Sequence, residues 1–289
     1  MLKLFIDSDI DMSLEEAKSL GVEMISMPYY IGEEAHYPYV DSETIDFKGF
    51  YDTLRKGIIP TTTALSPVDY MNYFEPHFKN GDDILYIHFS EAMSGTFNAM
   101  HIALTELQEK YPERKFYKVD TKAITILGYA IAKEAIKLYQ EGKSAEEIVS
   151  FVEELRDHYT VYFYSDDLKF FAKSGRVSGF AAFMGGLIGL HPIIYIGDDG
   201  KMKSVSKARG KKNALRKLVE YMEELGEDVL NYPIYLAHTD ADEILDDLEK
   251  MVREVVGSDV KLQRVMVNPT AGSHCGPNNV GLCFHCTKR

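Results

Sequence analysis

The chain alternates short apolar runs with longer amphipathic segments, and this alternation limits the folds that it can adopt. Residues 2–6 and 84–89 are typical of buried strands. Ser13 and Glu16 form a capping-box pattern, which predicts a helix over residues 14–20. Strands that alternate with helices in this way predict a parallel sheet with helices on both faces.

The pattern changes near residue 160, where we place a boundary between two domains. Residues 1–160 are expected to form an N-terminal α/β domain, with further strands at 22–31 and 115–119 and helices at 42–56, from 66, at 124–141 and at 144–158. Residues 161–289 are expected to form a C-terminal α/β domain with a mixed sheet, because Asp198-Asp199-Gly200 is typical of a hairpin turn. The elements expected there are strands at 161–164, 191–196, 202–206, 234–237 and 262–267 and helices at 168–173, 178–190, 211–225 and 241–256.

The net charge of −13 argues against binding to nucleic acid, whose phosphates require a basic surface. The charge is distributed unevenly. Residues 169–217 hold eleven basic and two acidic residues, whereas the rest of the chain holds 21 basic and 43 acidic ones. This basic stretch is either a solvated face or a docking surface for a phosphate or an acidic partner.

The cysteines and the apolar runs indicate the compartment. Cys275, Cys283 and Cys286 lie close to the C-terminus, and an odd number in this arrangement does not indicate a disulfide framework. The first residues lead into Asp7-Ser8-Asp9 without the apolar region of a signal peptide. No uninterrupted run of 18 apolar residues is present to span a membrane. We therefore expect a cytoplasmic protein.

Small hydroxyl side chains follow the predicted strands repeatedly. One such residue would usually be a helix cap. Because ligands bind beyond the carboxyl ends of the strands in an open α/β sheet, several hydroxyl groups at that edge predict a polar pocket. Ser94-Gly95-Thr96 has the character of an anion site, since glycine permits close backbone approach and a helix begins there. The residues concerned are Ser8, Thr61, Thr62, Thr63, Ser90, Ser94, Thr96 and Thr121.

Two later segments extend this hypothesis. The turn-rich loop 270–279 holds His274, and we expect this side chain to donate a hydrogen bond to the anion that Ser94 and Thr62 bind. A lone loop histidine without a ligand is the plainer interpretation. The segment 174–178, which contains Arg176, precedes the small, apolar run 180–190. That run is either a core helix packed closely through its glycines or the wall of a tunnel for an acyl chain.

At these residues a family resemblance becomes visible. The matching segments, in order, are Asp7-Ser8-Asp9, Thr62-Thr63 through Ser66-Pro67, Ser94-Gly95-Thr96, Asp120-Thr121 with Gly128, Leu168, Gly175-Arg176-Val177-Ser178, Lys207 through Leu215, and His274-Cys275-Gly276-Pro277. Each segment alone is a weak signal, but the ordered set covers nearly the whole chain. The chain resembles the DegV family, which includes the fatty-acid-binding subunits of bacterial fatty acid kinase.

The resemblance implies two α/β domains that bury a long-chain fatty acid between them, without a cofactor. It implies that Thr62, Ser94 with Gly95, and His274 bind the carboxylate, and that Arg176 lies near it. Ser8, Thr63, Thr121 and Gly276 are implied to lie close to the ligand.

The resemblance also implies a partner. Arg209, Lys211 and Lys212 match a basic segment that would dock a fatty acid kinase catalytic subunit, which forms acyl phosphate for phospholipid synthesis. The chain itself is then a lipid-binding subunit without catalytic residues, and transient contact with a membrane surface is expected.

Two departures from the family pattern bear on head-group geometry and chain preference. The family often reads Thr-Ser-Gln-Pro-Ser-Pro where this chain has Thr62-Thr63-Ala64-Leu65-Ser66-Pro67. The glycine after Gly-Pro is replaced by Asn278, which also tolerates left-handed backbone angles.

The proposed site divides the work of binding between two parts of the ligand. Burying an acyl chain contributes roughly 0.8 kcal/mol per methylene, or about 11 kcal/mol before costs for a chain of about fourteen methylenes. The carboxylate loses its hydration unless hydrogen bonds replace water, and charge-assisted bonds from hydroxyl groups and a histidine supply them.

Three other functions have weaker support in the sequence. In a hydrolase, Ser94 and His274 would be nucleophile and base, but no Gly-x-Ser-x-Gly elbow surrounds Ser94. In a nucleotide enzyme, Gly142-Lys143-Ser144 would end a P-loop, but its first glycine is replaced by Lys137. In a metal site, Cys283 and Cys286 would be ligands with Cys275 and His274 nearby, but a second well-spaced pair is missing, so we expect no metal.

Overall fold

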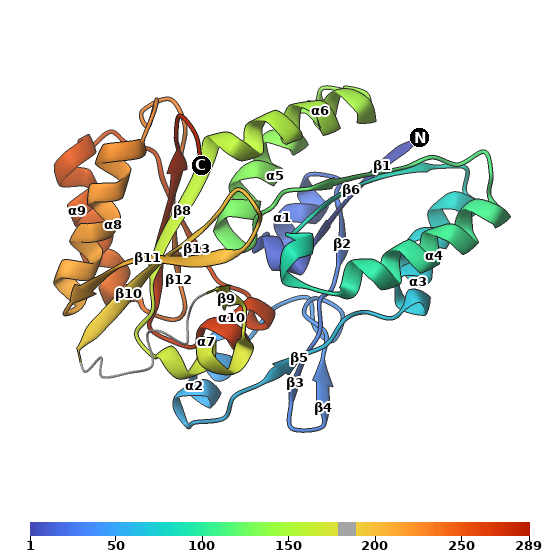
Figure 1. Cartoon of the computed structure of the whole chain (residues 1–289). Helices are drawn as coiled ribbons and strands as arrows, with labels where there is room; N and C mark the ends of the chain where they lie inside the picture. The colour runs from blue at the N-terminus through green and yellow to red at the C-terminus, as the bar shows by residue number, and fades with distance from the viewer. Residues whose placement is uncertain (179–188) are drawn as a thin grey trace.

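The computed structural model describes residues 1–178 and 189–289. The first half of the chain forms a parallel sheet in the order β2 (Glu23–Ile25), β1 (Leu2–Asp7), β6 (Asp83–His88) and β7 (Phe116–Asp120). Figure 1 shows α3 (Pro67–Lys79) and α4 (Thr96–Lys110) on one side of this sheet and α5 (Thr125–Gln140) and α6 (Ala145–Leu155) on the other. The predicted parallel sheet with helices on both faces is confirmed.

The central strand β6 shows why these residues form a covered sheet. Ile84, Leu85, Tyr86 and Ile87 are all fully buried. Side chains on both faces of a strand are buried only where both faces are covered, as they are in parallel sheets flanked by helices. The 3₁₀ turn η1 (Ser8–Ile10) and helix α1 (Leu14–Ser19) follow β1, and η2 (Glu91–Met93) follows β6.

The later part of the chain forms a mixed sheet. Its order is β13 (Leu262–Met266), β12 (Ile234–His238), β14 (Val280–His285), β8 (Tyr159–Tyr164), β10 (Leu190–Ile196), β11 (Met202–Arg209) and β9 (Val177–Ser178). Helices α8 (Lys211–Leu225) and α9 (Asp242–Val256) lie on its outer side, and α5 packs against β8, β12 and β14 (Figure 1). The predicted mixed sheet is confirmed, and α5 takes part in the packing of both sheets.

A third, small sheet joins β4 (Glu34–His36), β3 (Tyr29–Ile31) and β5 (Thr61–Thr62), with α2 (Phe47–Arg55) between β4 and β5. This excursion of the N-terminal half packs on α10 (Pro269–Cys275) near the end of the chain. Tyr51 Oη donates to the Val267 carbonyl at 2.7 Å, and Thr270 Oγ1 donates to the Met27 carbonyl at 2.6 Å. These bonds fix the position of α10 relative to β5.

Several expected elements need correction. Residues 270–279 were expected to form a loop, but those up to Cys275 belong to α10. The helix begins here because Asn268 Oδ1 accepts the Ala271 N–H at 3.0 Å and Pro269 takes the first helical position. The strand expected at 22–31 is interrupted between β2 and β3, and the helix expected at 42–56 begins at Phe47, where Asp46 caps it. The remaining short elements are η3 (Arg156–His158) and α7 (Leu168–Ser174).

Two expectations stay predictions. The helix expected at 178–190 falls largely on residues 179–188, which lie outside the described residues. The strands of the parallel sheet end at Asp120, and those of the mixed sheet begin at Tyr159. The expected domain boundary near residue 160 lies at the start of the mixed sheet.

Gly200 lies in the turn between β10 and β11, where the mixed sheet contacts the N-terminal half. Its φ is +73°, and its carbonyl accepts a hydrogen bond from Ser90 Oγ at 2.8 Å. A Cβ at this position would lie 2.2 Å from the same Oγ and 3.4 Å from the backbone of Lys122. The turn therefore fits its neighbours closely only as glycine.

We predict that Gly200→Ala lowers the free energy of unfolding more than Gly21→Ala does. Gly21 has a φ of +72°, so alanine brings the same backbone strain of about 1–2 kcal/mol at both sites, but the space around Gly21 is open. Loss of the Ser90 bond adds roughly 1 kcal/mol at Gly200. Urea unfolding measures the difference, and equal losses in the two variants would contradict this account of the contact.

Candidate functional site

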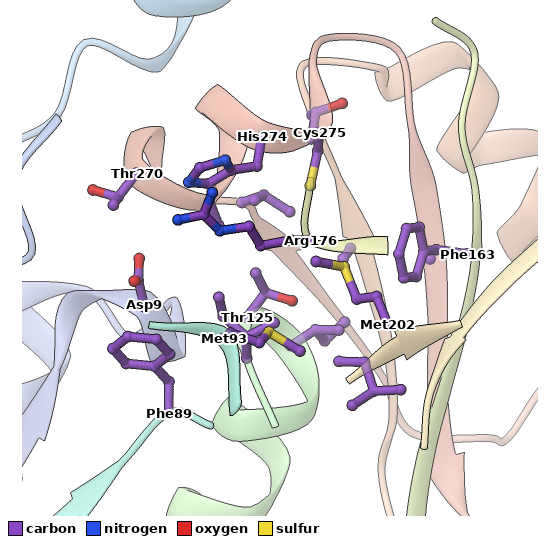
Figure 2. Close-up of a pocket in the computed structure, with 18 of the residues that line it drawn as sticks. Asp9, Phe89, Met93, Thr125, Phe163, Arg176, Met202, Thr270, His274 and Cys275 are labelled. Atoms are coloured by element: carbon purple, nitrogen blue, oxygen red, sulfur yellow. The ribbon is translucent and has the colours of Figure 1, made fainter. Parts of the chain in front are cut away.

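A cavity lies between the two larger sheets and takes lining residues from both halves of the chain (Figure 2). The atom-free space in and around it is about 1010 Å³, part of which is open solvent. About half of the lining residues have apolar side chains: Met27, Phe89, Met93, Ile124, Ile126, Val161, Phe163, Ile196, Met202, Ala237, Val267, Ala271 and Val280. A lining of this kind suits an apolar ligand.

Polar side chains from distant parts of the sequence also line this cavity. Thr62, Thr63, Ser94, Arg176 and His274 all contribute to its wall. Thr62 is held by β5, whose pairing with β3 places it opposite Tyr29. Thr62 Oγ1 and His274 Nε2 lie 2.8 Å apart, a hydrogen bond across 212 positions of sequence. The structure thus brings together the predicted head-group residues Thr62, Ser94, Arg176 and His274 in one cavity.

Among the described residues, no hydrogen bond uses the hydroxyl hydrogen of Ser94. Ser94 ends the 3₁₀ turn η2 with extended backbone, and its Oγ accepts the Thr96 N–H at 3.2 Å. A hydroxyl group that accepts one bond still has its own O–H to donate. Thr96 Oγ1, by contrast, accepts the Leu65 N–H at 3.1 Å and forms a hydrogen bond with Tyr70 Oη at 3.0 Å. Ser94 is therefore the better donor to a ligand.

His274 is electrically neutral at physiological pH. Burial, with a smaller effect from the positive charge of Arg176, lowers the pKa of His274 to about 4. A neutral imidazole has one nitrogen that donates and one that accepts. A ligand carboxylate at this end of the cavity would oppose the effect of Arg176 and raise the pKa of His274.

Arg176 supplies positive charge at the same end. It lies between α7 and β9, and its guanidinium donates to the Ser174 carbonyl. Figure 2 shows the Arg176 guanidinium close to the His274 imidazole, on the cavity side of α10. Arg176 is solvent-exposed, so it lies where the cavity meets water.

Four other predicted residues are not among those that line the cavity. Ser8 Oγ accepts the Met27 N–H at 2.9 Å, and Thr121 Oγ1 donates to the His88 carbonyl at 2.8 Å. Gly95 begins α4, and Gly276 ends α10 with a φ of +79° and would place a Cβ 2.3 Å from the Phe170 ring. These residues shape the walls of the site, and their expected closeness to a ligand stays a prediction.

The predicted docking residues lie elsewhere. Arg209 is exposed at the end of β11, and Lys211 and Lys212 are exposed in the first turn of α8. Lys211 Nζ forms an ion pair with Asp166 Oδ2 at 3.2 Å. Partner docking at this surface is likewise untested and remains a prediction.

Sequence reasoning missed several lining residues, above all Asp9, Thr125 and Cys275. Asp9 had a readable signal, because it follows β1 in the acidic run Asp7-Ser8-Asp9-Ile10-Asp11. Its side chain is only 4% exposed. Thr125 and Cys275 carried no comparable signal in the sequence.

The enzymatic alternative was a pairing of Ser94 and His274 as nucleophile and base. A serine nucleophile requires a base within hydrogen-bond reach. Among the described residues, the hydrogen bond of His274 Nε2 is to Thr62, and no bond joins it to Ser94.

The described residues contain no group of three or more His, Cys, Asp or Glu side chains placed to hold a metal ion. Within residues 1–178 and 189–289, no helix is both long and apolar enough to cross a bilayer.

Known proteins with the same sequence pattern and fold are readily found. The model of the DegV family, described as uncharacterised proteins, matches residues 1–286. A DegV domain-containing protein of Clostridium perfringens is 33% identical over 282 residues, which cover 97% of this chain and 96% of that protein.

Two solved structures show the same fold. A DegV family protein from Thermus thermophilus, described by its fatty acid binding, has a TM-score of 0.85 at 24% identity, with 99% of each chain covered. The Fak B3 protein of Streptococcus pneumoniae fatty acid kinase, loaded with linoleic acid, has a TM-score of 0.79 at 16% identity, also with 99% of each chain covered.

We predict that Arg176→Gln raises the pKa of His274 without restoring the usual value of 6.5. The charge of Arg176 is the smaller of the two causes, and burial persists in the variant. Histidine NMR titration of ligand-free protein measures this pKa, with Lys250→Gln on α9 as a charge-matched control that should leave it near 4. A wild-type His274 that titrates at its ordinary pKa would contradict the description of the site.

Proposed function

This chain belongs to the DegV family, and we propose that it is a fatty-acid-binding protein that presents a buried carboxylate to a partner kinase. The observation that carries the proposal is the bond between Thr62 and His274, with Ser94 and Arg176, in a cavity that is otherwise largely apolar. An amphipathic ligand with one anionic end matches this distribution.

The apolar part of the cavity supplies the affinity. Each methylene removed from water contributes roughly 0.8 kcal/mol, and immobilising the ligand offsets part of the sum. The side chains that would surround the acyl chain come from α5, from β8 and from the β10–β11 hairpin, and include Ile126, Phe163 and Met202. Because α5 belongs to the N-terminal half and the strands belong to the mixed sheet, the acyl chain would lie between the two halves of the protein.

The polar part fixes the orientation of the ligand. A carboxylate that leaves water requires replacement donors. Ser94 offers a hydroxyl hydrogen, the Thr62–His274 pair offers a second donor, and Arg176 offers charge. Charge-assisted bonds of this kind are roughly twice as strong as bonds between neutral groups.

The relatives support the same ligand class. The Thermus thermophilus structure is described by its fatty acid binding, and the Streptococcus pneumoniae protein holds linoleic acid. We infer the same class of ligand for this chain.

The proposed reaction takes place with a partner. The carboxylate oxygen attacks the γ-phosphorus of ATP, the bond from that phosphorus to the β,γ-bridging oxygen breaks, and acyl phosphate and ADP are formed. ATP would be bound by the kinase catalytic subunit. This chain would hold the acyl end, and Arg176 at the solvent-facing side would lie near the transferred phosphoryl group.

The direct test is mass spectrometry of protein purified without denaturation and then denatured. We expect a co-purified long-chain fatty acid, or uptake of added palmitate or oleate by protein that has lost its lipid. Neither co-purification nor uptake would refute the proposal.

We predict that Thr62→Val, Ser94→Ala and His274→Ala each weaken fatty acid binding by about tenfold to a hundredfold, because each removes a donor to a charged group worth about 1.5–3 kcal/mol. Displacement of a fluorescent fatty acid measures the affinity. Ser150→Ala on the exposed face of α6 is the control and should bind like wild type. Wild-type affinity in all three site variants would show that the head-group site is misplaced.

We predict that Arg209→Glu with Lys212→Glu leaves fatty acid binding unchanged but slows acyl phosphate formation by at least about tenfold, because charge reversal opposes docking of an acidic partner. The assay traps acyl phosphate with hydroxylamine in the presence of the kinase subunit and ATP. Lys250→Glu, which reverses the charge of a residue on α9, is the control. An undiminished rate in the double variant would exclude this surface as the docking site.

A further inference from the structure

Asp9 is a buried acid that faces the cavity without a complete set of hydrogen bonds. It belongs to η1, directly after β1, and its side chain is 4% exposed. It lines the cavity, yet its Oδ1 has no hydrogen-bond partner among the described residues. A buried polar atom without a partner carries a desolvation cost that a ligand can relieve.

The neighbouring acids differ from Asp9 in what they contact. Asp7 Oδ2 accepts bonds from Tyr86 Oη and the Phe89 N–H, both at 3.0 Å. Asp11 Oδ1 accepts the N–H of Asn268 at 2.8 Å and its side-chain amide at 2.6 Å. Asp7 and Asp11 thus hold the fold together and do not line the cavity, whereas Asp9 faces it.

Asp9 lies at the polar end of the cavity. Figure 2 shows its carboxyl group directed toward the end that carries Thr270, Arg176 and His274. Asp9 also lies close enough to Tyr70 and Cys275 for its ionised form to raise their pKa values. Tyr70 bonds to Thr96, whose N–H donates to Ser94, and Cys275 follows His274 in α10. Both neighbours are therefore part of the head-group surroundings.

The surroundings favour the acid form of Asp9. Burial raises its pKa well above the usual value, the negative charges of Asp7 and Asp11 raise it further, and the amide of Asn268 opposes them in part. The other titratable groups near it are the Tyr70, Tyr86 and Cys275 side chains, which stay uncharged because burial raises their pKa values as well. An uncharged carboxylic acid has one O–H to donate.

We propose that Asp9 is a further head-group residue, whose carboxylic acid donates a hydrogen bond to the carboxylate of the fatty acid. The inference rests on the proposed function and deepens it. A carboxylic acid and a carboxylate can share one proton, whereas two carboxylates at the same place repel each other. Asp9 therefore makes binding depend on its own protonation, with the acid form competent.

The test compares Asp9→Asn, Asp9→Leu and wild type for oleate binding between pH 6 and pH 9. Asparagine keeps the shape and a donor but cannot ionise, and leucine removes the donor. The affinity of each variant is divided by that of wild type at the same pH, so that changes in oleate itself cancel. Asp247→Asn, on the exposed face of α9, is the control and should give a ratio of one throughout.

We expect Asp9→Leu to bind about tenfold more weakly than wild type at pH 6 and Asp9→Asn to bind within about threefold of wild type. Where a rise in pH ionises wild-type Asp9, its charge repels the ligand, so the affinity of Asp9→Asn relative to wild type increases. Ratios near one for both variants at every pH would overturn the role of Asp9. Wild-type protein that binds no oleate at any pH would instead refute the proposed function.

Discussion

The hydrogen bond between Thr62 and His274 is the interaction on which the arrangement of the site depends. It joins β5 of the N-terminal half to α10 near the end of the chain. The bonds from Tyr51 to Val267 and from Thr270 to Met27 hold the two elements in place from either side. Together these three contacts bring Thr62 and His274 to the same end of the cavity.

Charge at this end of the cavity is controlled by burial. Burial keeps His274 neutral and favours the acid form of Asp9. Among the described lining residues, Arg176 then carries the full charge that remains, and its side chain is exposed to solvent. An empty site arranged in this way has a net positive character and offers several donors, which is the complement of a single carboxylate. The surrounding apolar side chains exclude the water that would otherwise compete for those donors.

The sequence was sufficient to predict the two kinds of sheet and much of the polar end. Strand-end hydroxyl groups identified Thr62 and Ser94, but Ser8 and Thr121 gave the same signal and bond to backbone groups of Met27 and His88. The hydrogen-bond partner of such a hydroxyl group depends on the neighbouring segments of the fold. The sequence pattern of a single strand does not identify those neighbours. The Asn268-Pro269 pair is a pattern from which the start of α10 could have been predicted. The alternating acids Asp7, Asp9 and Asp11 were an unusual feature of the sequence that could have drawn attention to Asp9. The contacts of Arg176 depend on tertiary packing and could not be read in advance.

The most direct measurement is a crystal structure with a long-chain fatty acid that carries bromine at its terminal carbon, located by anomalous scattering. The account predicts a bromine peak in the apolar part of the cavity, near Phe163 and Met202, with the carboxylate beside Thr62, Ser94 and His274. A bromine peak beside Thr62 and His274, or a fatty acid outside the cavity, would contradict it.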